Sequence, residues 1–144
     1  MPQSLGCIIV HIVFSTKNRA PALVPAVRPV LYAYMATVSR ELGCECYRAG
    51  GIEDHVHLAV RLSRTLTVAK FVERVKTSSS AWLKEQSPDL HDFYWQDGYG
   101  AFSVSKTRLP ALLRYIDTQE EHHYKQGFQD EYRDFLRQHD IEFD

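Results

Sequence analysis

The chain has 144 residues, a net charge of −1 and 44% hydrophobic residues, which suffices for one globular domain with a substantial core. Its longest apolar run, over 6–14, is too short to cross a bilayer, so we expect no membrane span. The first residues lack the basic segment and cleavage site of a signal peptide, and the three cysteines form no C-x-x-C pair. These features favour one cytoplasmic domain over 1–144 with reduced thiols.

The charge is distributed unevenly along the chain. Residues 1–114 hold 14 Lys/Arg against 9 Asp/Glu, whereas residues 115–144 hold 3 against 9. Contact with phosphates needs local positive charge rather than a basic protein, so a nucleic-acid partner is not excluded. The candidate DNA-binding residues follow the first strand or lie on the second helix: Lys17, Arg19, Lys70, Arg74 and Lys76.

Hydrophobic periodicity and turn residues predict four strands and four helices. In chain order they are a strand over 5–15, a helix over 26–43, strands over 44–51 and 55–62, a helix from Thr65 or Thr67 to about 85, a strand over 99–105, and helices over 108–124 and 128–139. This order predicts an α+β fold, a ferredoxin-like (RRM-like) βαββαβ sandwich with an antiparallel sheet and additional C-terminal helices. We expect the first strand and the strand over 55–62 to be neighbours in the middle of the sheet.

The strand over 55–62 carries a His-x-His pattern. Residues two apart in a strand project from one face, so His55 and His57 point the same way. Two neutral imidazoles on a rigid strand are a natural pair of ligands for a divalent metal. Asp54 directly precedes the pair, but a strand neighbour faces away from it, so we do not expect Asp54 to be a ligand unless the turn redirects it.

The helix over 108–124 carries a second set of polar side chains. Tyr115 and Gln119 are four residues apart and share a helical face, and His122 lies on the same face. A tyrosine hydroxyl can attack phosphorus as a nucleophile, and an amide oxygen can complete a metal's ligand set. His122 is an alternative to Gln119 as the third ligand, or the group that accepts the tyrosine's proton.

Four segments in the same order resemble one known family. They are 11–19, 76–79, 95–105 and 115–123, and together they span most of residues 8–123. The chain is similar to the small single-tyrosine HUH transposases of the insertion-sequence 200/605 class. The segment 11–19 resembles the family's first strand and basic turn, and Tyr115-x3-Gln119 matches its catalytic helix.

The resemblance implies a function and a set of partners. Tyr115 would be the nucleophile, and His55, His57 and Gln119 would hold Mg²⁺ or Mn²⁺. The substrate would be single-stranded DNA with a hairpin near the cleavage site, cut and rejoined through a 5′-phosphotyrosine intermediate. The family works as homodimers, in which the catalytic helix can serve the partner's histidine pair, so the sequence leaves cis and trans placement of Tyr115 open.

Three other interpretations use the same residues differently. A domesticated nuclease acting on chromosomal hairpin repeats would keep every residue named above. A replication or conjugation nuclease often has a second tyrosine, for which Tyr124 and Tyr132 are candidates, although neither repeats the Tyr-x3-Gln context. A non-catalytic single-stranded DNA-binding module would keep the fold, but an intact set of four site residues speaks against it.

Overall fold

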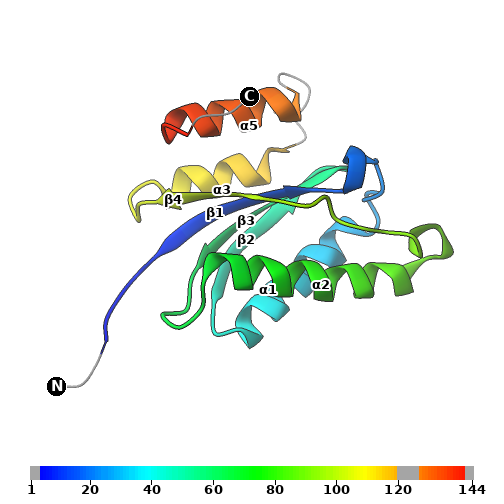
Figure 1. Cartoon of the computed structure of the whole chain (residues 1–144), viewed down its shortest axis with the longest axis horizontal. Coiled ribbons are helices and arrows are strands. Elements are labelled where there is room, and N and C mark those ends of the chain that lie inside the picture. The colour runs from blue at the N-terminus through cyan, green and yellow to red at the C-terminus, as the bar shows by residue number, and fades with distance from the viewer. Residues whose placement is uncertain (1–3, 120–126, 142–144) are drawn as a thin grey trace.

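The computed structural model describes residues 4–119 and 127–141. Short 3₁₀ helices η1 (Lys17–Arg19) and η2 (Pro88–Leu90) interrupt the loops. The main elements, shown in Figure 1, are β1 (Ile9–Ser15), α1 (Arg28–Glu41), β2 (Glu45–Gly51), β3 (His55–Arg61), α2 (Val68–Gln86), β4 (Gly100–Val104), α3 (Leu109–Asp117) and α5 (Phe128–Gln138).

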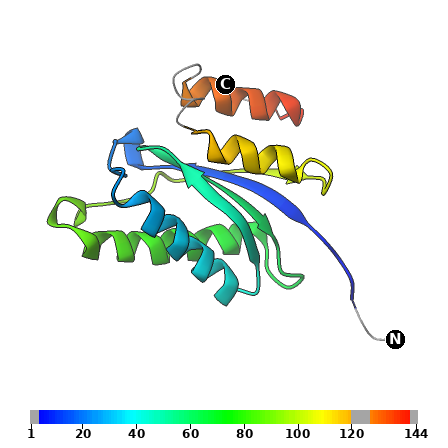
Figure 2. The ribbon, with the colours of Figure 1, turned by 180° about the vertical axis from the view of Figure 1, so that it is seen from behind.

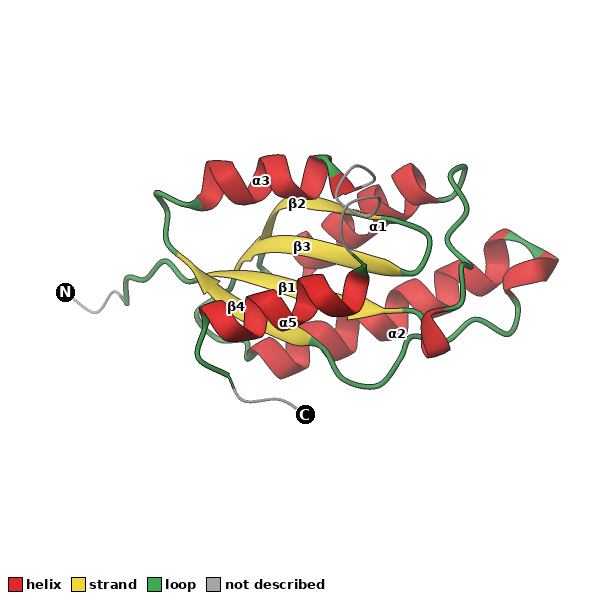
Figure 3. Ribbon diagram, turned by 90° about the horizontal axis from the view of Figure 1, so that it is seen from above, coloured by secondary structure: helices red, strands yellow, loops and turns green. Residues whose placement is uncertain are grey.

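The four strands form one antiparallel sheet in the order β2-β3-β1-β4. Figure 3 shows β1 and β3 in its middle, as the sequence predicted. The register pairs Ser15 with His55 and Val13 with His57. The end of β1 therefore lies beside the histidine pair, and the expected ferredoxin-like arrangement is confirmed.

Helices cover both faces of the sheet. α1 and α2 lie on one face, and α3 and α5 lie on the other (Figures 1 and 2). The alternation along β3 explains this division, because Val56, Leu58 and Val60 belong to the main core with α1 and α2. His55 and His57 consequently face the layer of α3 and α5.

α2 shows how the sequence specifies one of these layers. The Thr67 hydroxyl caps its first turn by accepting a hydrogen bond from the Lys70 backbone N–H at 3.1 Å. Phe71, Val75 and Leu83 recur at helical spacing and are buried against the sheet. Among the helices of the described residues, none is both long and apolar enough to span a membrane.

Most predicted elements end within two residues of the observed bounds, but two are markedly shorter in the structure. β1 begins at Ile9 rather than at residue 5 because Ile9 pairs with Arg61, the last residue of β3. Before that pair the chain has no neighbouring strand, and Leu5 is 81% exposed. The helix expected over 108–124 is interrupted, since α3 ends at Asp117 and Thr118 is in a turn. The rest of that prediction, 120–124, lies outside the described residues.

Two glycines on the sheet let the second helix layer come close. A Cβ on Gly50 would lie 2.6 Å from Ile116 Cγ2 of α3. A Cβ on Gly100 would lie 2.8 Å from Tyr132 Cε2 of α5. Both distances are far shorter than ordinary carbon–carbon contacts of about 3.5–4.0 Å. Because glycine has no Cβ, these two positions allow α3 and α5 to lie this near to the histidines.

Candidate active site

Two buried histidines on β3 form the centre of the site. His55 is 1% exposed and His57 is fully buried, and their ring centroids are 5.0 Å apart. They lie on the same face of the strand, as the His-x-His pattern predicted. A central strand holds such groups rigidly, which suits ligands whose positions must stay fixed.

The Nδ1 atom of each of these histidines lies within hydrogen-bond distance of a neighbouring side chain. His55 Nδ1 lies 2.9 Å from Asp54 Oδ1, and His57 Nδ1 lies 2.8 Å from His11 Nε2. The sequence argument expected Asp54 to face away from the pair, but it precedes β3 and its carboxylate contacts the outer nitrogen of His55. Such outer contacts orient metal-binding histidines in proteins. They leave both Nε2 atoms to face the space under α3 and α5.

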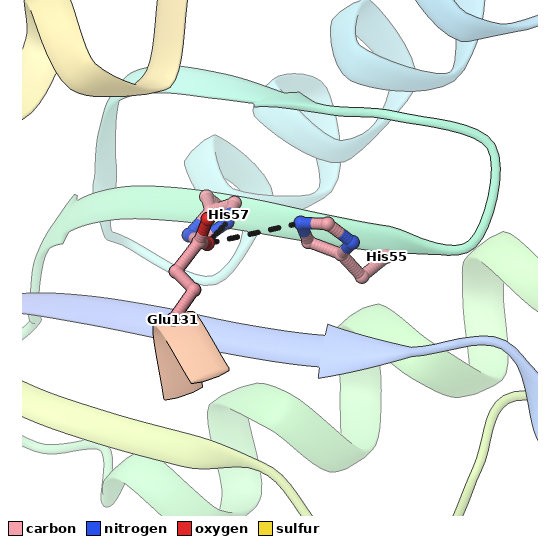
Figure 4. Close-up of side chains that lie close together, drawn as sticks. All are labelled: His55, His57 and Glu131. Atoms are coloured by element: carbon pink, nitrogen blue, oxygen red, sulfur yellow. Dashed lines mark ion pairs between the residues drawn. The ribbon is translucent and has the colours of Figure 1, made fainter. Parts of the chain in front are cut away.

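Glu131 of α5 reaches into that space (Figure 4). Its Oε1 lies 3.0 Å from His57 Nε2 and 4.0 Å from His55 Nε2, and the residue is 4% exposed. The ligand atoms of His55, His57 and Glu131 all lie within 4.8 Å of one another. Sequence reasoning missed this carboxylate, although it lies one helical turn before the inward-facing Phe135.

Gln119 reaches the pair from the segment that follows α3. Its Oε1 lies 3.0 Å from His55 Nε2, and the side chain is 2% exposed. Its amide nitrogen donates a hydrogen bond to the Tyr115 carbonyl at 3.4 Å. The structure thus brings Gln119 to the histidines as expected, whereas His122 lies outside the described residues.

Tyr115 lies against the same histidines within one chain. Its ring centroid is 5.6 Å from that of His57, and Phe135 of α5 packs edge-on against it at 5.6 Å. Burial, and then the hydrogen bond and charge of Glu131, raise the pKa of Tyr115. The hydroxyl is therefore protonated at neutral pH while Glu131 occupies this position.

The donor set fits a divalent metal. His57 Nε2 and Glu131 Oε1 are both buried, and within the described part of the chain neither has a hydrogen-bond partner in good geometry. Burial lowers the pKa of His57, against the opposing effect of Glu131, so the imidazole lone pair is available. Two imidazoles with carboxylate and amide oxygens suit ions that accept mixed nitrogen and oxygen ligands. His55, His57, Glu131 and Gln119 can thus hold such an ion.

The predicted DNA-binding residues fall into two groups. Lys17 and Arg19 are exposed on η1, which follows β1 at the His55 end of the sheet. Lys70 and Arg74 are exposed on α2, in the layer on the far side of the sheet from the histidines. The Lys76 ammonium donates hydrogen bonds to the Gln96 and Gly98 carbonyls at 2.8 and 2.6 Å, so it holds the loop before β4.

Solved structures share this fold. A putative transposase from Deinococcus radiodurans R1 superimposes with a TM-score of 0.64 at 21% identity, covering 83% of this chain and 98% of the other. A REP-associated tyrosine transposase, solved bound to a REP hairpin, gives a TM-score of 0.63 at 14% identity, covering 85% of this chain and 72% of the other. No curated protein matches the chain in sequence.

A family model places the sequence as well. The model described as "Transposase IS200 like" matches residues 5–119, which hold both histidines, the tyrosine and the glutamine of the site. The match covers most of the chain and the solved structures share its fold. The chain therefore belongs to the IS200-like transposase family.

Proposed function

We propose that this transposase cuts and rejoins single-stranded DNA through a covalent bond between Tyr115 and a 5′ phosphate. The observation that carries the proposal is the meeting, within one chain, of a tyrosine and a buried histidine pair whose Nε2 atoms face the side-chain oxygens of Gln119 and Glu131. Tyrosine supplies a nucleophile for phosphorus, and the histidines with their oxygen neighbours supply a metal site. Family membership supports the same chemistry.

The residues have separate roles in this reaction. The Tyr115 oxygen attacks the phosphorus in line, forming the phosphotyrosine bond while the bond to the 3′ oxygen breaks. The tyrosine's proton passes to solvent water as this bond forms, and the released 3′ oxygen takes up a proton from solvent. A free 3′ hydroxyl can then attack a second phosphotyrosine bond, so strands are exchanged without an external energy source.

We propose Mg²⁺ or Mn²⁺ as the ion. His55, His57 and Glu131 would hold it, with Gln119 next to His55 as a further oxygen donor. When bound, the ion would neutralise phosphate charge and polarise the phosphoryl group. Imidazole ligands suit Mn²⁺ better than Mg²⁺, which prefers oxygen. We therefore expect stronger activity with Mn²⁺.

We propose a DNA hairpin as the substrate, with Lys17 and Arg19 contacting its phosphates. The turn that carries them is fixed, since the Asn18 backbone N–H donates to Gln96 Oε1 at 2.9 Å, and the Thr16 backbone N–H donates to the Asp54 carbonyl at 2.9 Å. It therefore lies next to the site. The solved relative bound to a REP hairpin supports this substrate class.

The first test is a cleavage assay on single-stranded DNA hairpins that flank the gene. The wild type with Mn²⁺ or Mg²⁺ should form a protein–DNA adduct that survives denaturant, and a chelator should abolish it. Tyr115→Phe should form none while still binding the hairpin. Hairpin binding without any wild-type adduct would instead identify a non-catalytic DNA-binding module.

A mixing experiment tests whether the tyrosine acts within its own chain. The ring centroids of Tyr115 and His57 of the same chain are 5.6 Å apart. A mixture of Tyr115→Phe with a His55→Ala/His57→Ala variant should therefore form no adduct. Trans placement, which the family resemblance also permits, would restore one working site in each mixed dimer. Recovery of adduct in the mixture would therefore refute cis placement. Homodimer formation itself stays a prediction.

A further inference from the structure

The two histidines of the proposed metal site are held by different kinds of group. The carboxylate of Asp54, when ionised, can only accept a hydrogen bond, so it holds a proton on His55 Nδ1, and a metal would bind at the remaining nitrogen, Nε2. His57 instead meets the imidazole of His11, which can donate or accept. Which ring nitrogen of His57 carries the proton therefore depends on whether His11 donates or accepts the hydrogen bond between them.

His11 is built into the centre of the sheet. It is 3% exposed, and its ring stacks on His57 with centroids 5.0 Å apart and an interplanar angle of 22°. Phe135 packs edge-on against it at 4.8 Å, and Phe102 of β4 lies 6.0 Å away. These contacts fix the ring, so its Nε2 stays 2.8 Å from His57 Nδ1.

Metal binding at His57 Nε2 determines where the proton of the ring lies. The ring must then carry its proton on Nδ1, where the described structure offers His11 Nε2 as the hydrogen-bond partner. A buried N–H without an acceptor is costly. Without the metal, the His57 proton can move to Nε2, which lies 3.0 Å from Glu131 Oε1. An acceptor at position 11 thus favours the metal-bound state in particular.

We propose that His11 is a positioning residue, which accepts a hydrogen bond from the Nδ1–H group of His57 and thereby keeps His57 Nε2 available to bind the metal. The inference rests on the proposed metal site. In this role His11 does not touch the ion or the DNA, and it acts only through His57. It does for His57 what Asp54 does for His55.

The test is Mn²⁺ affinity, measured by the EPR signal of free Mn²⁺ in the absence of DNA. His11→Phe keeps an aromatic ring against His57 but has no acceptor, so Mn²⁺ should bind about 10–100-fold more weakly. His11→Gln restores an acceptor at a similar reach and should recover most of the affinity. Ile9→Val, a buried change on the same strand and face, is the matched control and should bind as the wild type does.

Thermal melting identifies a variant that fails to fold, and His11→Leu replaces His11→Phe in that case. Equal Mn²⁺ affinity in the wild type and the folded apolar variant would overturn the role of His11 but leave the proposed metal site standing. Equally weak binding by the Gln and apolar variants would also overturn it, because an acceptor would then not be what matters. If the wild type binds no Mn²⁺, or if His55→Ala leaves its affinity unchanged, the metal site of the proposed function fails, and the inference fails with it.

Discussion

Replacing Gly50 with alanine tests whether the close approach of α3 to β2 positions the nucleophile. The added Cβ would lie 2.6 Å from Ile116 Cγ2 and 3.1 Å from the Ile116 carbonyl oxygen. Ordinary carbon contacts are about 3.5–4.0 Å, so α3 would have to retreat by about 1 Å. Gly50 does not have a positive φ, so alanine suits its backbone and the perturbation is purely steric.

That retreat should affect both stability and rate. Overpacking of this kind costs about 1–3 kcal/mol of the free energy of unfolding. Ile116 lies in the last turn of α3 and directly follows Tyr115, and a displacement of about 1 Å can lower a reaction rate about 100-fold. Gly50→Ala should therefore lower the melting temperature and slow adduct formation under single-turnover conditions, with hairpin binding retained.

Two further variants show whether the clash is the cause. Gly6→Ala is the control, because its Cβ would have no atom within 4 Å. Adding Ile116→Ala to Gly50→Ala removes the nearest clashing atom, so the double variant should lose less stability than the two single losses added together. If Gly50→Ala matched Gly6→Ala in both stability and rate, the argument that this glycine places α3 would be wrong.

Two more predictions concern α5 and the buried histidines. Gly100→Ala would push against Tyr132 and move the neighbouring Glu131, so calorimetry should show weaker Mn²⁺ binding; an unchanged affinity would argue against Glu131 as a ligand. Burial lowers the pKa values of both His11 and His57, so the unfolded chain binds protons below about pH 6.5 that the folded protein excludes. Their stabilising effect is full above that pH and is lost progressively as the pH falls from 7.5 to 5.5. Urea unfolding in chelator measures this change, and a stability that does not fall over this range would contradict it.

Local periodicity was enough to predict part of the site. Alternation along β3 places His55 and His57 on one face, and a four-residue spacing places Tyr115 and Gln119 on one face of a helix. These relations depend only on the geometry of a single element. The strand and helix order likewise predicted the sheet, because ferredoxin-like folds connect it in one way.

Contacts between distant segments were not predictable in the same way. His11 meets His57 only because β1 pairs with β3 in a register that one sequence does not reveal. Glu131 belongs to a later helix, whose placement over the sheet depends on packing at Gly100. Because residues 115–144 are rich in acidic residues, nothing in the sequence distinguishes Glu131 from an ordinary solvent-exposed carboxylate.

The face of the sheet on which α2 lies follows from the connections between the strands. Crossovers within a sheet are right-handed, so α1 and α2 share a face, and the apolar side of β3 needs their cover. His55 and His57 then face the other layer. Lys70 and Arg74 on α2 are therefore separated from the histidines by the sheet.

The proposed tyrosine chemistry is tested most directly by locating the DNA on the protein. The covalent adduct formed with Mn²⁺ would be trimmed with nuclease, digested with protease and sequenced by mass spectrometry. We expect a nucleotide 5′ phosphate on Tyr115 and a free hydroxyl at the 3′ end of the released strand. A phosphate on Tyr132 or Tyr124, or a bond to the 3′ side of the cut, would contradict it.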